Sequence, residues 1–357
     1  MGRLDDYRAA LRAARPETQP AELVEALDTG GPRFASFVVD HGLGPLWHAR
    51  TGREEFHASR LAAEALYLAQ AHALEEIDTL FERAGIEYVV IKGSANRLLL
   101  YDQPALRACH DLDLLVRRDD RVRAAAALCG AGFRPVLDAL SISRELVLCR
   151  GPSNIDLHWG LLREGRLRHD LTDEMVTRRR RVGPLWMLDG EDALFTLLVH
   201  PAFAQHLAGW NMGLHRVADV LAWLRTQPCD RAALHARLAQ NGVRTAAWAT
   251  LRWVELLARP DLPAALEAMM TGLQPGVLRR GWLDAWLQHD LPARTAGAHW
   301  VRLLGFSPLL HDTPGDAMRA LAGRRRARRR SAVDLAAFAA LQAPAGAAAS
   351  ASPATRG

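Results

Sequence analysis

Apolar residues recur every three to four positions along the first part of the chain. In residues 54–83 these positions are Ala62, Leu66, Ala69, Ala73, Ile77 and Leu80. This spacing places the side chains on one face of a helix, and Gly85 stands where a helix commonly ends. We therefore predict an N-terminal helical segment over residues 1–84.

After this segment the apolar period shortens, which predicts strands. Residues 86–91 form an apolar run typical of a central strand, and residues 111–116 predict a second strand. Between them, residues 94–100 predict a short helix. Asp119 is a helix-capping residue type, and it predicts another helix that ends near Gly130.

The next segment predicts a hairpin at the edge of the same unit. Residues 145–149 and 154–159 have strand patterns, and Gly and Pro lie in the turn between them. Residues 133–137 predict one more short strand, which Pro135 would confine to an edge of the sheet. Strands and helices thus alternate, and we predict an α/β unit over residues 85–188.

Helical spacing returns from Asp189 onward. Leucine and valine recur at intervals of three and four, and most of the tryptophans fall in this part of the chain. We predict an α-helical domain over residues 189–310. Residues 311–357 form an Arg-rich tail, and its last part, residues 343–357, has an Ala/Pro/Ser/Gly composition that predicts disorder.

Composition excludes several classes of protein. The 357 residues are 49% hydrophobic and 24% charged, as in ordinary globular proteins. No window of about eighteen residues is apolar and free of charge, so we expect no membrane partner. The N-terminus does not have the pattern of a secretory signal. The four cysteines are widely spaced and include no C-x-x-C pair, which predicts neither structural zinc nor a disulfide framework. We expect a cytoplasmic location.

The positive charge is concentrated in one cluster. The net charge is +5, and the arginine cluster that begins at Arg324 and ends at Arg330 contributes six positive charges, so the rest of the chain carries 5 − 6 = −1. A nearly neutral body does not predict a protein built to hold nucleic acid. Nucleic-acid binding would therefore depend on this cluster, which we expect to be solvated and mobile.

The candidate chemistry lies in the predicted strands. Asp111 and Asp113 are two residues apart, and alternation along a strand points them to the same face. Two adjacent carboxylates repel each other, so a cation between them is the simplest reason for their presence. Asp156 lies in the predicted hairpin and adds a third carboxylate if the two strands are neighbours. Three hard oxygen ligands suit Mg²⁺ or Mn²⁺.

A turn near these carboxylates has the features of a phosphate site. Gly93 and Ser94 follow the first strand and open a helix, so backbone N–H groups there can face a phosphate. Lys92 and Arg107 can neutralise further phosphate charge, and Lys92 is the only lysine in the chain. The alternative is an ordinary strand-to-helix turn in which Ser94 is the N-cap.

Two further residues are accessory candidates. His158 shares the face of Asp156, where it could contact a phosphate, orient a carboxylate or serve structure alone. Asp219 could reach the cleft from the helical domain, or pair with Arg216 one helical turn earlier.

These motifs resemble the nucleotidyltransferase superfamily typified by DNA polymerase beta, and more narrowly a bacterial family of uncharacterised nucleotidyltransferases. The resemblance lies in residues 91–94, Tyr101, Arg107, residues 111–116, Gly132, Phe133 and residues 155–159, and more weakly in His200 and Asp219. It implies an α+β fold with a mixed sheet core, flanked by helices, between the N-terminal helical segment and the C-terminal helical domain. It also implies that Asp111 and Asp113 bind both metals and that Asp156 helps to activate an acceptor hydroxyl.

The resemblance implies transfer of a nucleoside monophosphate from a nucleoside triphosphate (NTP), ATP for instance, to the hydroxyl of an unidentified acceptor. The near-neutral body favours a small molecule or a protein as that acceptor. One alternative is a catalytically inactive module that binds nucleotide or protein, because a fold does not fix a function. A lower-ranked alternative is RNA modification, with the arginine cluster as the tether.

Overall fold

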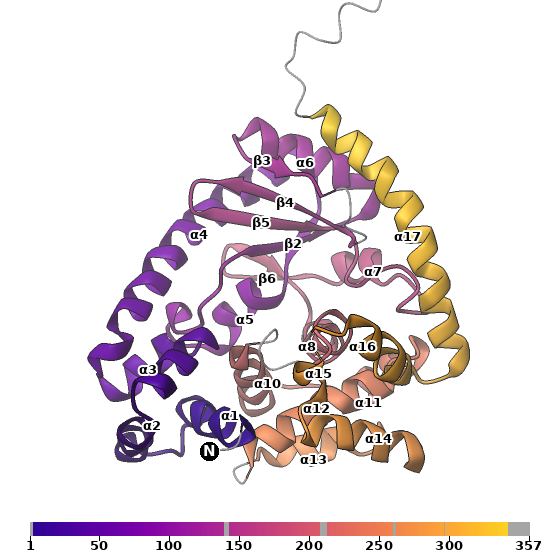
Figure 1. The fold of residues 1–357 in the computed structure, drawn as a ribbon. Coiled ribbons are helices and arrows are strands. Elements are labelled where there is room, and N and C mark those ends of the chain that lie inside the picture. Colours follow the sequence, from indigo (N-terminus) through magenta and orange to yellow (C-terminus); the bar gives the residue numbers. More distant parts are fainter. Residues whose placement is uncertain (1–2, 139–142, 208–212, 260–261, 296, 342–357) are drawn as a thin grey trace, which may run out of the picture.

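The computed structural model describes residues 3–138, 143–207, 213–259, 262–295 and 297–341. In Figure 1 a mixed sheet occupies the middle of the molecule, the C-terminal helical domain lies below it, and one long C-terminal helix runs along the side. The predicted α+β class is confirmed. The predicted disorder of residues 343–357 concerns residues outside those described.

Four α-helices and two short 3₁₀ turns form the N-terminal segment. The helices are α1 (Arg3–Leu11), α2 (Pro20–Asp40), α3 (Gly44–Thr51) and α4 (His57–Ala84), and the 3₁₀ turns are Arg12–Ala14 and Glu54–Phe56. Helix α4 ends as predicted, because Gly85 adopts a left-handed φ of 61° and its N–H donates to the preceding turn. Helix α2 is kinked at Gly31, which is followed by Pro32.

The described strands form one seven-stranded mixed sheet in the order β3-β4-β5-β2-β1-β7-β6. Their bounds are β1 (Tyr88–Val90), β2 (Leu112–Val116), β3 (Arg134–Val136), β4 (Glu145–Arg150), β5 (Ser153–His158), β6 (Arg180–Val182) and β7 (Leu185–Met187). Pro135 lies in the edge strand β3, as predicted. The sequence analysis did not anticipate β6 and β7, which are only three residues long each.

The two strands with the candidate carboxylates are neighbours. Strand β2 pairs in parallel with β5, and β4 and β5 form the predicted antiparallel hairpin. Strand β1 pairs antiparallel with β2 and parallel with β7. The helices and 3₁₀ turns that connect these strands are α5 (Lys92–Leu100), Pro104–Leu106, Arg118–Asp120, α6 (Arg121–Gly130) and α7 (Thr172–Thr177).

The C-terminal domain is helical, as the spacing predicts. Its elements are α8 (Gly190–Ala204), α10 (Leu214–Thr226), α11 (Arg231–Gln240), α12 (Arg244–Ala258), α13 (Ala264–Met270), α14 (Val277–Gln288), α15 (Leu291–Arg294), α16 (His299–Gly305) and the 3₁₀ turn Ser307–Leu310. Helices α8 and α12 are its most buried members. No helix in the described ranges combines the length and the apolar character that crossing a bilayer requires.

Helix α17 (Pro314–Ala340) replaces the mobile segment predicted around the arginine cluster. Its long run of Ala and Arg has high helix propensity, and Thr313 caps its start by accepting the N–H of Asp316. The helix returns to the sheet, where Phe338 packs against Trp159 with ring centroids 5.4 Å apart. The arginine cluster is therefore one part of a docked helix (Figure 1).

Two hydrophobic cores lie on opposite faces of the sheet. One core buries Leu112 and Leu114 against α4 and α6. The other buries Leu115 and Val89 against the helical domain. Because side chains alternate along a strand, Asp113 shares its face with Leu115 and points toward the helical domain. The site therefore lies between the sheet and the C-terminal helices.

Candidate active site

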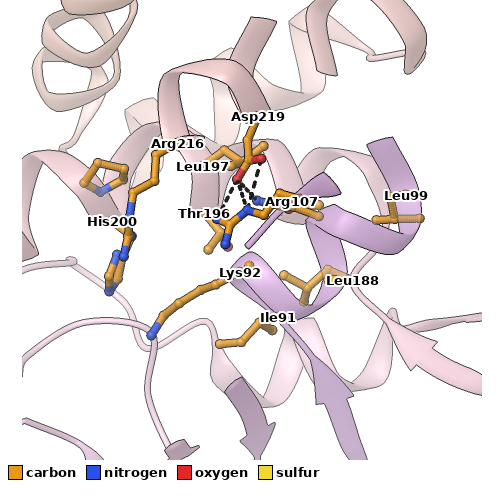
Figure 2. Close-up of a pocket in the computed structure, with 15 residues that line it drawn as sticks. Ile91, Lys92, Leu99, Arg107, Leu188, Thr196, Leu197, His200, Arg216 and Asp219 are labelled. Atoms are coloured by element: carbon orange, nitrogen blue, oxygen red, sulfur yellow. Dashed lines mark hydrogen bonds and ion pairs between the residues drawn. The ribbon is translucent and has the colours of Figure 1, made fainter. Parts of the chain in front are cut away.

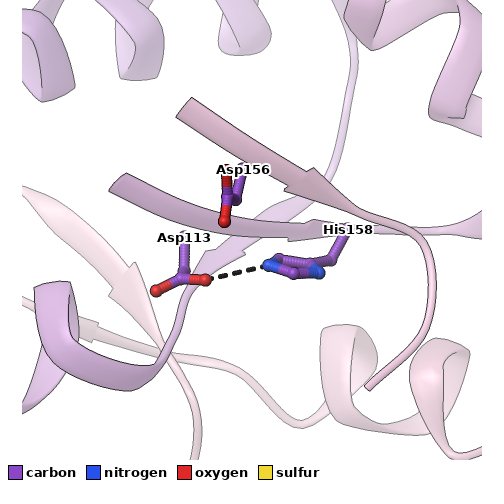
Figure 3. Close-up of side chains that lie close together, drawn as sticks. All are labelled: Asp113, Asp156 and His158. Atoms are coloured by element: carbon purple, nitrogen blue, oxygen red, sulfur yellow. Dashed lines mark hydrogen bonds and ion pairs between the residues drawn. The ribbon is translucent and has the colours of Figure 1, made fainter. Parts of the chain in front are cut away.

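Asp113 and Asp156 are direct neighbours across two parallel strands. The register of β2 and β5 pairs Asp113 with Asp156, and Leu115 with His158. Figure 3 shows the two aspartates on adjacent strands, with the His158 ring turned toward Asp113. The sheet thus brings together two of the three predicted carboxylates.

His158 and Lys92 both bind the Asp113 carboxylate. His158 Nε2 lies 2.9 Å from Asp113 Oδ1, and Lys92 Nζ donates to the same oxygen at 2.6 Å. Nδ1 of the His158 ring lies 3.3 Å from Glu145 Oε2. The ring therefore lies between two carboxylates, and its predicted role of orienting a carboxylate stays a prediction.

These contacts determine the charge state of Asp113. Burial alone would raise its pKa, because Asp113 is only 3% exposed. Lys92 and His158 outweigh burial, so the pKa of Asp113 falls well below its usual range. Burial lowers the pKa of Lys92, but the carboxylates of Asp113, Glu145 and Asp156 together raise it by more. The pair is therefore an ammonium and a carboxylate.

Asp156 has the opposite environment. Burial and the nearby Asp113 carboxylate raise the pKa of Asp156 to about 6. No hydrogen bond to its carboxylate is found among the described residues. A carboxylate with this pKa is mostly ionised at neutral pH, but it accepts a proton more readily than an ordinary aspartate.

Asp111 lies just before β2 rather than within it. It lines an open pocket together with Asp156 and Lys92. Among the described residues, the group that could hold a metal ion is Asp113, Asp156 and His158, whose ligand atoms lie within 4.8 Å of one another. In this group His158 stands where the sequence predicts Asp111, although the Asp111 charge still contributes to the raised pKa of Asp156.

The turn after β1 is held in place by a side chain as well as by its backbone. Lys92 has a left-handed φ of 53°, which is uncommon for a residue with a side chain. The Ser94 hydroxyl is buried, donates to the Asp111 carbonyl at 2.9 Å and accepts the Asp113 N–H at 3.3 Å. The Ser94 side chain thus ties the turn to β2 and fixes the position of Asp113.

Gly93 allows Arg107 to pass close to this turn. A Cβ at Gly93 would lie 2.6 Å from an Arg107 guanidinium nitrogen and 3.0 Å from the Cys109 sulfur. Gly93 therefore serves local packing, whatever its backbone N–H also binds.

Arg107 and Asp219 form a buried ion pair between the sheet unit and the helical domain. Arg107 Nη2 lies 2.8 Å from Asp219 Oδ2, and the two residues are 6% and 0% exposed. Asn96 and Tyr101 also donate to this carboxylate, each at 2.9 Å. Asp219 therefore does not pair with Arg216, and Figure 2 shows its bonds to Arg107. Burial lowers the pKa of Arg107, but Asp219 raises it by more.

Arg216 is a cation of the site that sequence reasoning considers only as a partner of Asp219. Figure 2 draws a second pocket, between α5, α8 and α10, in which Arg216 from α10 and His200 from α8 point toward the side where Lys92 ends. Lys92, His200 and Arg216 line both this pocket and the open pocket beside Asp156. Within the described ranges, no ion pair of Arg216 is found, and its Nε is buried without a hydrogen-bond partner. The sequence around Arg216 does not indicate that its side chain faces the site, because the sheet and α10 meet only in the tertiary structure.

The open pocket beside Asp156 is rich in cations. Its empty volume, including space open to solvent, is about 1000 Å³. Its charged and titratable lining residues are Lys92, Asp111, Arg144, Glu145, Asp156, His158, Arg163, Arg166, His200 and Arg216. We call it the carboxylate pocket. It combines a group that could hold a cation with arginines that could hold an anion.

The donor set fits a divalent cation. Two neighbouring carboxylates and an imidazole within 4.8 Å provide oxygen and nitrogen ligands, and Mg²⁺ or Mn²⁺ prefers the oxygens. Burial and then the neighbouring Asp113 carboxylate raise the pKa of Asp156, and a bound cation would stabilise the ionised form of both carboxylates. Lys92 already relieves part of the negative charge on Asp113, so a metal and Lys92 would share this carboxylate.

The comparisons with known proteins place the chain in a family. The model of the family described as uncharacterised nucleotidyltransferases matches residues 34–259, which include the whole carboxylate pair and its surroundings. The chain therefore belongs to the uncharacterised nucleotidyltransferase family. Neither the curated proteins nor the solved structures give a significant match.

Proposed function

We propose that this protein is a metal-dependent nucleotidyltransferase that moves a nucleoside monophosphate from an NTP to a hydroxyl of an acceptor, either a small molecule or a protein. One observation carries the proposal: Asp113 and Asp156 lie in register on parallel strands, and Asp156 lines a pocket that is also lined by cations. Membership of the nucleotidyltransferase family supports the reaction class.

The metal would be held by Asp113 and Asp156, with His158 or Asp111 as a further ligand. When bound, Mg²⁺ or Mn²⁺ would neutralise charge on the transferred phosphoryl group and its leaving pyrophosphate. His158 holds the Asp113 carboxylate in place through its 2.9 Å contact. Arg216 faces the pocket without an ion-pair partner among the described residues, so it is available to a phosphate.

Asp156 is our candidate for accepting the proton of the acceptor hydroxyl. A general base works best when its pKa lies near the operating pH; in the metal-free site, burial and the Asp113 carboxylate raise the pKa of Asp156 to about 6. The attacking hydroxyl oxygen forms a bond to the α-phosphorus, the bond to pyrophosphate breaks, and Asp156 takes the proton.

The test uses α-labelled NTPs with Mg²⁺ or Mn²⁺ and a panel of hydroxyl-bearing acceptors, including the protein itself. We expect label transfer and pyrophosphate release by the wild type. Asp113→Asn should reduce transfer by about 100-fold or more, because it removes a carboxylate that would hold the metal at the reacting phosphate. Asp119→Asn is the matched control, since Asp119 is an exposed aspartate in a 3₁₀ turn.

Circular dichroism must show that Asp113→Asn is folded, because Lys92 loses its partner in this variant. Equal transfer by wild type and a folded Asp113→Asn variant would refute the proposal.

One observation favours a second candidate, an inactive module that binds nucleotide or protein. Lys92 Nζ and His158 Nε2 both contact Asp113 Oδ1, so a side-chain cation already neutralises the central carboxylate. In an inactive protein, Lys92 would substitute for the metal permanently.

Mn²⁺ binding, measured by electron paramagnetic resonance, separates the two candidates. The transferase should bind Mn²⁺ in the presence of NTP, and Asp113→Asn should weaken that binding. An inactive module should bind Mn²⁺ only after Lys92→Ala removes the competing ammonium.

A further inference from the structure

Helix α17 and the loop after β5 are in backbone contact. A Cβ on Gly323 would overlap the Glu164 carbonyl oxygen, and a Cβ on Gly165 would lie 2.6 Å from the Arg319 carbonyl oxygen. Only glycine permits this approach at both positions. The contact places Glu164 and Arg166, the neighbours of Gly165 in the chain, next to one face of α17.

A pocket lies beside this contact, and three arginines line it. Arg163 and Arg166 come from the loop and Arg324 comes from α17, and His206, Ser307 and His311 line the pocket as well. We call it the arginine pocket. Its one lining carboxylate, Glu164, is already paired with Arg326 and Arg330 on α17, each at 2.9 Å.

The three arginines have no carboxylate of their own. In the described part of the chain, no ion pair is found for Arg163, Arg166 or Arg324. Arg166 instead donates to the Phe203 carbonyl at 3.1 Å and lies over the Phe203 ring. The Nε atom of Arg324 is buried without a hydrogen-bond partner, which is costly for a charged group.

The guanidinium groups are close enough to affect one another. Burial, Arg163 and Arg324 together lower the pKa of Arg166 to about 10. Burial and Arg324 also lower the pKa of Arg163. Like charges held together at a partly buried place repel each other, and a bound anion would relieve that repulsion.

We infer that the arginine pocket is a second anion site, which binds a phosphate group through Arg163, Arg166 and Arg324. Arg163 and Arg166 also line the carboxylate pocket. A substrate can therefore place one phosphate here while its reacting group lies near Asp156. That the phosphate belongs to a substrate rests on the proposed function; the anion site itself does not.

Two parts of the reaction could supply this phosphate. One is the phosphate tail of the NTP, and the other is a phosphate on the acceptor. The recognition chemistry is the same, because guanidinium groups bind phosphate oxygens through paired charged hydrogen bonds.

The experiment measures inorganic phosphate binding to the full chain by calorimetry, without metal or nucleotide. Arg324→Gln and Arg163→Gln should each weaken phosphate binding by about 10- to 100-fold, as expected for the loss of a charged hydrogen-bond donor. Arg324→Lys should restore part of the affinity, because it keeps the charge. Arg328→Gln is the matched control: Arg328 is exposed on the same helix and lines neither pocket.

The competition between phosphate and ATP then identifies the source. If the NTP tail uses the site, phosphate competes with ATP and Arg324→Gln weakens both. If the acceptor supplies the phosphate, ATP and phosphate bind together and Arg324→Gln leaves ATP affinity unchanged.

The inference fails if the wild type does not bind phosphate, or if Arg324→Gln and Arg163→Gln bind it as tightly as the wild type. Asp113→Asn distinguishes this failure from failure of the proposed function. This variant should lose nucleotide transfer but keep its phosphate affinity, since Asp113 is not part of the arginine pocket.

Discussion

The Asp219 carboxylate offers a sharp test of how the sheet unit and the helical domain are joined. It is fully buried and accepts hydrogen bonds from Asn96 in α5, Tyr101 at the end of α5 and Arg107 after the 3₁₀ turn Pro104–Leu106. Asp219→Ala removes every one of these acceptor contacts at once. The variant would leave the Arg107 guanidinium buried, with the Ala108 carbonyl as its remaining partner among the described residues.

The expected loss in the free energy of unfolding follows from the buried Arg107 guanidinium that is left without its carboxylate. Removing one partner of a buried ion pair typically costs about 3–5 kcal/mol. The loss of the Asn96 and Tyr101 contacts would cost about 1–3 kcal/mol on its own, but the contacts share one carboxylate and do not add fully. We therefore expect Asp219→Ala to lower the free energy of unfolding by about 3–5 kcal/mol.

Urea unfolding followed by tryptophan fluorescence measures this change, since the chain contains ten tryptophans. Arg216→Ala is the control for the local alternative, in which Asp219 pairs with its neighbour one turn earlier. It should cost less than about 1 kcal/mol, because it removes no ion pair of the described structure. The double variant Arg107→Met/Asp219→Leu should recover part of the loss, since it buries no unpaired charge.

The reasoning is refuted if Asp219→Ala costs less than about 1 kcal/mol. It is also refuted if Arg216→Ala costs as much as Asp219→Ala.

Three further predictions concern packing and helix α17. Gly93→Ala should lower the free energy of unfolding by about 1–3 kcal/mol in urea, because the new Cβ would meet the fixed Arg107 guanidinium. Gly130→Ala is the control: there is open space around Gly130, so the free energy of unfolding should change by no more than about 0.5 kcal/mol. Hydrogen bonds from arginine and threonine side chains lower the pKa of Asp316, so its stabilisation is complete above the unfolded carboxyl pKa of about 3.9 and is lost as pH falls toward the folded value. Asp316→Asn should therefore lose less stability than the wild type between about pH 5 and pH 3. Equal losses would show that the ionised Asp316 carboxylate does not stabilise the fold. Deleting residues 323–357 should expose the core and increase binding of an apolar dye, because Phe338 is buried against the sheet unit; unchanged dye binding would contradict the docking of α17.

The sequence predicts the strands of the site well, because their signals are local. Apolar alternation gives β2 and β5 their buried faces, and the hairpin follows from the turn between two strand patterns. The mutual position of Asp113 and Asp156 then needs only one further assumption, that these strands are neighbours. The register of the sheet confirms that assumption.

Other features of the site carry no local signal. His158 lies beside Asp113 because the strands align Leu115 with His158 across the sheet. Arg107 and Asp219 are 112 residues apart in the chain, and neither has a neighbour in sequence that predicts the pair. Lys92 stands out in the sequence as the only lysine, yet its contact with Asp113 depends on a left-handed backbone conformation at the start of α5.

Helix α17 marks the clearest limit of sequence reasoning. A run of arginines has the composition of a solvated segment, and the same run has high helix propensity. The outcome depends on Gly165 and Gly323, which let two distant backbones touch, and on Glu164, which pairs with two of the arginines. These contacts form only when the loop after β5 is already in place.

By itself, the sequence determined the helices and strands around the site, the buried faces of the central strands and two acidic residues of the candidate site, since periodicity and residue type act over a few positions. The tertiary structure alone decided which cations face those acids and how α17 closes the arginine pocket. The physical reason is that charge pairing and burial depend on distance in space, and residues far apart in the chain become neighbours only after the sheet and the helical domain have packed together.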